Sequence, residues 1–252
     1  MPPKVDFAYF SFTEITNPNE HASYNEWHLF DHMPENLALP GVVWAQRWVA
    51  RPDLPPLALD DALRPVHYVT AYLMTEPAER TLAEFLALGQ RLRSLGRFHQ
   101  HRRALLGGPF RLVKCYAAAG ALVGAEAIPY RPHRGVLVTV ADVVERGRSD
   151  EVARWLDDVH VPELLTVPGV AGVWTFQAMP AATTTLPPNP ATRSVHLCWL
   201  DDDPARVALA IAEKTGDVPF ADTTWHTSFR RAVEPVDPRG PFDWFEKEPG
   251  RG

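Results

Sequence analysis

Two histidines stand at the same point of two similar segments. His32 opens the run His-Met-Pro-Glu, and His160 opens His-Val-Pro-Glu. At the end of a helix the dipole favours the imidazolium, whereas an apolar enclosure favours the neutral ring. Such opposed effects suit proton transfer near neutral pH. The pattern predicts that one of the two acts as general acid or base. The structural alternative is that each caps its helix or bonds the following turn.

A second set of candidates lies on alternate positions of predicted strands. Within residues 66–73, Tyr68, Thr70 and Tyr72 share one face, since side chains alternate along a strand. This face is polar but uncharged, which is typical of a ligand cavity rather than of a solvent-facing strand. The same alternation adds further lumen candidates: Tyr9, Ser11, Thr139, His196 and Cys198. The simpler explanation is that Tyr and Thr favour strands anyway.

Weaker signals surround these residues. His28 and His32 are four residues apart on one predicted helix, a spacing that lets two imidazoles share a metal, but the spacing fixes no third ligand. The second-strand tryptophans could form flat lumen walls or simply core: Trp44, Trp48 and Trp174. The group His99, His101, Arg102 and Arg103 follows a predicted helix and is typical of a solvated basic end.

A repeat positions the candidates. Residues 32–42 and 160–170 are identical at seven of eleven positions, at an offset of 128. Unrelated segments would share about one position at ordinary residue frequencies. The same offset aligns Trp27 with Trp155, Tyr68 with His196 and Thr70 with Cys198. This regularity indicates a duplicated folding unit.

Each repeat predicts the order β-α-β-β-α-β. The first helix starts at the capping sequence beginning with Ser23 and is expected to end by Met33, before Pro34. Strands are expected at residues 5–12, 42–49, 66–74, 111–117, 135–144, 170–177, 195–200 and 223–233, and helices at 81–95, 150–160 and 204–214. The predicted fold class is α+β, with two fused ferredoxin-like halves forming an intramolecular dimeric α/β barrel around a lumen. The expected units are 1–117, a linker 118–134, 135–234 and a tail 235–252 whose three aromatic residues pack against the rest.

Composition excludes several classes. A net charge of −6 and a pI near 5.9 argue against a nucleic-acid surface. Two cysteines give no disulfide framework, and no apolar run or leader predicts a membrane or secreted protein, so a cytoplasmic location is expected. The chain carries no nucleophile elbow, P-loop or dinucleotide fingerprint.

The segment from Trp27 to Val42, with its echo from Trp155 to Val170, resembles the EthD-like branch of the dimeric α/β-barrel superfamily, in which a helix ending in His-x-Pro leads through Pro-Gly into the second strand. The resemblance covers nearly the whole chain as topology, but only some fifteen residues per half as motif. It implies a scaffold shared by cofactor-free cyclases, isomerases, dehydratases, monooxygenases and haem enzymes.

The leading functional prediction is a lyase or isomerase without an organic cofactor, acting by proton transfer on a hydrophobic, cyclic or aromatic, oxygenated ligand. The predicted catalytic residues are His32, His196, Tyr68, Tyr72, Tyr9 and His160. One alternative is a haem- or oxygen-dependent oxidoreductase with a lumen histidine as axial ligand, and a divalent metal also stays open. A second alternative is a non-enzymatic ligand-binding or stress-associated protein. Monomer and homodimer are both compatible with the sequence.

Overall fold

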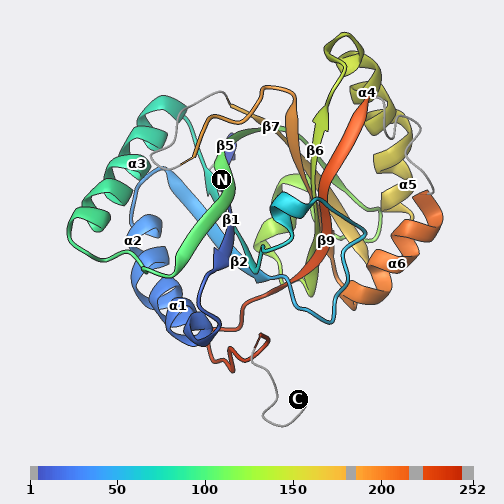
Figure 1. The fold of residues 1–252 in the computed structure, drawn as a ribbon. Coiled ribbons are helices and arrows are strands. Elements are labelled where there is room, and N and C mark those ends of the chain that lie inside the picture. Colours follow the sequence, from blue (N-terminus) through green and yellow to red (C-terminus); the bar gives the residue numbers. More distant parts are fainter. Residues whose placement is uncertain (1–4, 180–185, 216–223, 246–252) are drawn as a thin grey trace.

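A computed structural model describes residues 5–179, 186–215 and 224–245 (Figure 1). The strands are β1 (Phe7–Ile15), β2 (Val42–Val49), β3 (Ala58–Leu59), β4 (Tyr68–Met74), β5 (Arg102–Ala117), β6 (Gly135–Val143), β7 (Val170–Ala178), β8 (Arg193–Leu200) and β9 (Trp225–Pro235). The helices are α1 (His21–Trp27), α2 (Met33–Leu37), α3 (Ala78–Ser94), α4 (Ser149–Trp155), α5 (Val161–Leu165) and α6 (Pro204–Thr215). None of the described helices is long and apolar enough to cross a membrane.

The strands form one antiparallel sheet that closes on itself. Its order is β2-β4-β1-β5-β7-β8-β6-β9-β3, and β2 also pairs with β9 through Trp48–Pro235 and Val49–Glu234. The pairings β5–β7, β2–β9 and β3–β9 join the N-terminal half to the C-terminal half, so a single barrel replaces two facing sheets. Helices α1, α2 and α3 lie on one side of this barrel and α4, α5 and α6 on the other (Figure 1). The predicted α+β class is confirmed.

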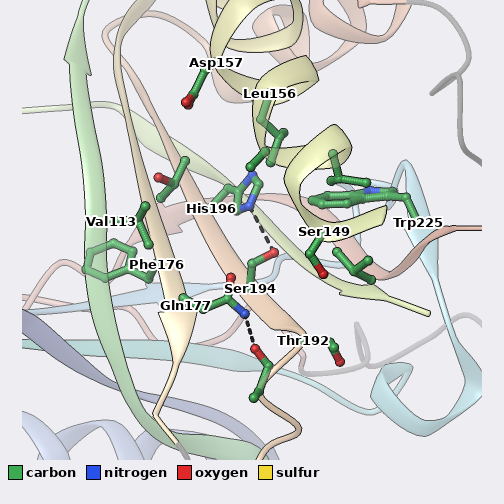
Figure 2. A pocket seen from close by; sticks show the side chains of 15 residues that line it. Val113, Ser149, Leu156, Asp157, Phe176, Gln177, Thr192, Ser194, His196 and Trp225 are labelled. Atoms are coloured by element: carbon green, nitrogen blue, oxygen red, sulfur yellow. Dashed lines mark hydrogen bonds between the residues drawn. The ribbon is translucent and has the colours of Figure 1, made fainter. Parts of the chain in front are cut away.

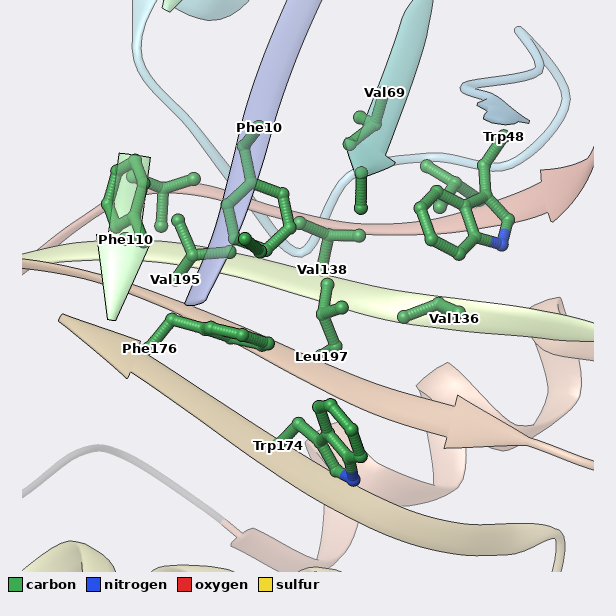
Figure 3. Packing of buried hydrophobic residues seen from close by; sticks show 14 of the residues in the cluster. Phe10, Trp48, Val69, Phe110, Val136, Val138, Trp174, Phe176, Val195 and Leu197 are labelled. Atoms are coloured by element: carbon green, nitrogen blue, oxygen red, sulfur yellow. The ribbon is translucent and has the colours of Figure 1, made fainter. Parts of the chain in front are cut away.

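The barrel interior is filled with apolar side chains. Figure 3 shows Phe10, Val69, Val138 and Leu197 meeting from different strands, and all four are fully buried. Trp48 and Trp174 belong to the same cluster, with Trp44 packed against it. The predicted polar lumen is therefore wrong. A barrel this small has an interior that its own side chains fill.

The polar face of the strands points outward instead, toward the helices. Thr70 and Tyr72 on β4 line a cavity together with Phe85 and Leu86 of α3. His196 on β8 lines a pocket together with Val152 of α4. Alternation correctly groups the polar residues, but both faces of this sheet are covered, so the pattern alone does not tell which face lies inside.

The first helix runs past the predicted end. A five-residue π-helical segment, His28–His32, joins α1 to α2, and Pro34 lies in the first turn of α2. Proline lacks an N–H and clashes with the carbonyl four residues earlier in a regular α-helix. A wider π turn accommodates such an interruption. The same arrangement recurs at Leu156–His160 before Pro162.

The element bounds repeat at the offset seen in the sequence, but only in part. β1 and β6, α1 and α4, and the two π segments each differ by 128. The third strands differ by 126, because Thr70 faces Ser11 whereas His196 faces Thr139. The predicted alignments of Tyr68 with His196 and of Thr70 with Cys198 are therefore wrong by two residues. Two residues fewer therefore separate paired positions of the second and third strands in the C-terminal half, as Arg47 pairs with Thr70 and Thr175 with His196.

The C-terminal segment packs against the barrel as its aromatic residues predict. Phe245 stacks on His21 with ring centroids 4.4 Å apart, and Phe242 and Trp244 lie against a cluster containing Tyr24 and Tyr68. The expected tail also includes residues 246–252, which lie outside the described residues, as does Thr223 at the start of the last expected strand. β5 begins at Arg102, nine residues before the expected start at Arg111.

Candidate functional site

The first candidate site lies between the sheet and α3 in the N-terminal half, and we call it the N-terminal cavity. Its volume is about 60 Å³. It brings three predicted catalytic residues together, His32, Tyr72 and Tyr9. The full lining is Tyr9, Ser11, His28, His32, Asn36, Thr70, Tyr72, Phe85, Leu86, Gly89, Arg93, Phe98 and Arg102.

His32 is held by aromatic contacts and does not cap a helix. Its ring stacks on Trp27 with centroids 4.7 Å apart and lies edge-on to Phe98 at 5.1 Å and to His28 at 5.2 Å. Burial, together with the nearby guanidinium groups of Arg102 and Arg47, lowers its pKa to about 3. His32 is therefore neutral at pH 7, and its buried Nδ1 has no hydrogen-bond partner.

The predicted tyrosines separate into two environments. Tyr72 and Tyr9 both pack on Phe85, at centroid distances of 5.2 and 4.8 Å, and burial raises the pKa of the Tyr72 hydroxyl. Tyr68 does not line the cavity. Its hydroxyl accepts a hydrogen bond from Asn25 Nδ2 at 2.9 Å and lies 3.0 Å from His21 Nδ1. Tyr68 thus belongs to a closed hydrogen-bond network under the tail.

The second candidate site lies between β5, β7, β8 and α4, and we call it the C-terminal pocket (Figure 2). Its volume is about 460 Å³, within the usual range of small-molecule sites. The walls are mainly apolar. The lining residues are Val113, Val143, Ser149, Val152, Ala153, Leu156, Asp157, Thr175, Phe176, Gln177, Ala191, Thr192, Ser194, His196 and Trp225.

His196 is the titratable centre of this pocket. Its Nε2 lies 3.1 Å from Ser194 Oγ, and Ser194 Oγ donates a long bond of 3.4 Å to the Ala141 carbonyl. A hydroxyl that donates to a carbonyl is left to accept, so the network assigns the ring proton to Nε2 and the lone pair to Nδ1. Burial and the charge of Arg230 lower the His196 pKa to about 4, which keeps the ring neutral.

His196 and Trp225 also border a smaller chamber of about 20 Å³ that contains His160. His160 stacks on Trp155 at 4.7 Å, as His32 does on Trp27, and burial lowers its pKa to about 3. Arg230 is the cation of this chamber, and its Nε has no hydrogen-bond partner. Burial raises the pKa of the Cys198 thiol to about 12, so this cysteine is not an activated nucleophile.

Two arginines of the N-terminal half were missed as site residues. Arg102 was assigned to a solvated basic end, yet it lines the N-terminal cavity. Arg47 is buried to 1% exposure on β2, where it faces Thr70 on β4. The only charged residue in a strand of mainly apolar residues was the available signal for Arg47. For Arg102 the start of β5 had to be placed correctly first.

A metal centre at His28 and His32 gains no support. Within the described part of the chain, no group of three or more His, Cys, Asp or Glu side chains could hold a metal ion. The nearest acids on the same helical segment, Asp31 and Glu35, form ion pairs with Arg97.

No family model and no curated protein matches the sequence. Solved structures with the same fold do exist. A DypB variant from Rhodococcus jostii in complex with haem has a TM-score of 0.56 at 10% identity, covering 95% of each chain. A putative chlorite dismutase has a TM-score of 0.53 at 12% identity, covering 96% of this chain and 98% of the other. A haem-binding protein from Thermus thermophilus has a TM-score of 0.52 at 11% identity, covering 94% of this chain and 93% of the other.

These neighbours correct the expectation that the scaffold works without an organic cofactor, because one is a haem complex and another is described as a haem-binding protein. At 10–12% identity they establish the barrel fold alone, and they do not single out the EthD-like branch. The residue roles predicted from the sequence stay predictions.

Proposed function

We propose that the C-terminal pocket binds haem and that the chain is a haem-dependent oxidoreductase. The observation that carries the proposal is a pocket of about 460 Å³ that combines flat apolar walls with one buried, neutral imidazole. Haem enzymes commonly hold their iron through such an imidazole. The haem-containing neighbours on the same fold add support.

The lining residues fit this group chemically. Val113, Leu156 and Trp225 offer apolar surface for the porphyrin faces, and Figure 2 shows His196 among them. No Lys or Arg lines the pocket, but two cations stand at its edge. Lys114 pairs with the lining residue Asp157, and Arg193, between the lining residues Thr192 and Ser194, pairs with Asp142. Lys114 is available to a haem carboxylate at the cost of a half-exposed ion pair, which contributes little, whereas Arg193 is held by Asp142 and Asn189 in a partly buried network.

Haem, when bound, would supply one-electron and peroxide or oxygen chemistry. The chain's own part is to present and tune the ligand. Ser194 accepts the Nε2–H of His196 and so fixes the tautomer that leaves Nδ1 able to coordinate. Trp225, 5.5 Å from His196, shields the ring from water. His160 on the other side of His196 is neutral and can relay a proton.

Titration of the purified protein with ferric haem tests the proposal. We expect saturable binding at one haem per chain, with a shifted visible absorption band. His196→Gly should lose the shifted band and regain it on addition of imidazole. The matched control is His226→Gln, because His226 lies at the exposed end of β9 and bonds Asp60. The absence of saturable binding by the native chain contradicts the proposal.

Ala153→Trp tests whether haem binding depends on the C-terminal pocket independently of the stability of the fold. Ala153 is an exposed residue of α4 that lines the pocket, so an indole there should occlude it without disturbing the core. Haem binding should fall while the unfolding midpoint stays unchanged. Turnover of peroxide by the haem-loaded native chain is the second readout. Haem binding without turnover would support the haem-binding proposal and contradict the proposed oxidoreductase activity.

We further infer that the chain arose by duplication and that the EthD-like motif marks its descent. Support comes from the seven shared positions around His32 and His160 and from the element bounds that recur at 128 residues. The units 1–117 and 135–234 are the proposed copies.

A further inference from the structure

The N-terminal cavity is ringed by positive charge that no carboxylate neutralises. Arg93 and Arg102 line it, and Arg47 lies beside Thr70 on the neighbouring strand of the sheet. Within the described ranges, none of the three forms an ion pair. The acids nearby are engaged elsewhere, since Asp31 and Glu35 pair with Arg97, and Glu14 pairs with Arg103.

Arg47 is the most unusual of these cations. Its guanidinium is buried, stacks 4.9 Å from the Tyr24 ring and 5.2 Å from the Tyr68 ring, and donates from Nη2 to Asn25 Oδ1 at 2.9 Å. Its Nε and Nη1 have no hydrogen-bond partner. A buried charge without a counter-charge is expensive, and an anion close by would offset that cost.

Buried polar atoms without partners gather around the same space. They are His28 Nδ1, His32 Nδ1 and Thr70 Oγ1, and Tyr72 OH lies among them with the Asn36 side chain as its hydrogen-bonding neighbour. Buried polar atoms in proteins are almost always bonded, to the protein, to water or to a ligand. The Thr70 hydroxyl can donate, and each imidazole can donate as its Nδ1–H tautomer, so these atoms suit a guest that accepts hydrogen bonds.

The volumes of the cavity and of the adjoining groove indicate which size of ligand fits. A volume of about 60 Å³ holds roughly four water-sized atoms. A groove of about 370 Å³ adjoins it and shares Arg93, Phe98 and Arg102 with it. The inner space suits the three heavy atoms of a carboxylate group, and the groove over Phe98 suits a short carbon chain.

We propose that the N-terminal cavity is a binding site for a small organic carboxylate, with its head group inside the cavity and its chain in the groove. Arg102 and Arg93 supply charge-assisted hydrogen bonds to the carboxylate, and Arg47 supplies a fixed positive potential from the neighbouring strand β2. The hydroxyls of Thr70 and Tyr72 and the neutral imidazoles complete the donor set. The site lies in the half opposite the C-terminal pocket and does not rest on haem binding.

Calorimetric titration with propanoate, and with propanamide as its neutral isostere, tests this site. Ionic strength is held constant with a bulky sulfonate buffer that the cavity cannot admit. We expect propanoate to bind once per chain and propanamide not to bind. Arg102→Gln should weaken propanoate binding about tenfold or more, the effect of one charge-assisted hydrogen bond. Equal binding of acid and amide, or undiminished binding by Arg102→Gln, overturns the proposal.

Two further variants keep the outcome interpretable. Arg80→Gln is the matched control, because Arg80 is an exposed arginine of α3 that pairs with Glu84 and lines neither the cavity nor the groove, and its propanoate binding should match that of the native chain. Gly89→Leu blocks the cavity from α3, where an added Cβ meets nothing within 4 Å, so the fold is retained even if Arg102→Gln fails to fold. Propanoate binding by Gly89→Leu equal to that of the native chain places the anion elsewhere and overturns the proposal.

Discussion

The two halves bury a similar stack of tryptophan on histidine under their helices, but they surround it with opposite chemistry. In the ladders, Arg102 faces Ile15 and Trp225 faces Val143, and Ile15 and Val143 are 128 residues apart. The N-terminal cavity therefore has an arginine where the C-terminal pocket has a tryptophan.

A second pair of facing positions also differs between the two halves. Arg47 faces Thr70 in the first half, whereas Thr175 faces His196 in the second. A cation is thus lost and an imidazole gained at the centre of the sheet. The comparison teaches that one backbone layout supports a small cationic cavity on one side and a large apolar pocket on the other, with a few side chains deciding between them.

The largest effect is expected from Trp225→Arg. This substitution places in the C-terminal pocket the positive charge that Arg102 carries at the matching position of the N-terminal cavity. Trp225 is 5% exposed and lies near Arg230, so the new cation would be buried without a partner. We expect a loss of roughly 3–5 kcal/mol in the free energy of unfolding. Urea denaturation measures it. The reverse exchange, Arg102→Trp, should cost much less, and equal losses would contradict the difference drawn between the two sites.

Acid should destabilise both halves through their buried histidines. His32 and His196 titrate at about 3 and 4 when folded but near 6.5 when unfolded. The unfolded chain therefore binds protons first, so stability is complete above pH 6.5 and falls as pH drops toward the folded values. Each histidine should account for about 2 kcal/mol between about pH 7 and pH 5.

Denaturation at both pH values checks this, with His32→Leu and His196→Leu each expected to flatten the pH dependence. An unchanged slope in either leucine variant would show that its histidine is not buried neutral.

Arg47→Met should have a smaller effect on stability and a clear one on the anion. Replacing an unpaired buried cation by an apolar side chain of similar length is neutral or stabilising by about 1 kcal/mol, even though Asn25 loses a donor. The methionine variant should lose the rise in melting temperature that propanoate gives the native chain. A strongly destabilised Arg47→Met would reveal an internal counter-charge and weaken the contrast.

The smallest effect is expected at the rim of the C-terminal pocket. Lys114 pairs with Asp157, but its side chain is 50% exposed. Lys114→Gln should change the free energy of unfolding by less than about 0.5 kcal/mol, as exposed ion pairs contribute little. Thermal denaturation checks it, and weakened haem binding by this variant at unchanged stability would locate a haem carboxylate at this edge.

The sequence predicted the fold better than the sites. The second strand was placed at residues 42–49, as the structure has it, because Pro40-Gly41 punctuates the chain there. The His32 and His160 segments were correctly recognised as equivalent. The direction of the strand faces was not predictable, since Tyr68, Thr70 and Tyr72 alternate with Val69 and Ala71 equally well in either orientation, and only barrel closure decides which set lies inside.

Long-range geometry explains the remaining misses. Arg102 follows a helix in sequence, and only the pairing of β5 with β1 directs it into the cavity. The expected helix end before Pro34 relied on a local rule that the π turn relaxes. Tyr68 was grouped with Tyr72 by periodicity, but His21 and Asn25 from α1 engage its hydroxyl.

Each π segment determines how its histidine meets the tryptophan five positions earlier. A π turn holds one residue more than an α turn, and each residue of an α-helix rotates the chain by about 100°. Deleting one residue from Leu29–Asp31 would restore a regular helix in which the histidine follows Trp27 by four positions, a spacing that keeps the two rings on one face. The π turn therefore lets the two rings stack at a spacing of five residues, which a regular α-helix would place about 140° apart.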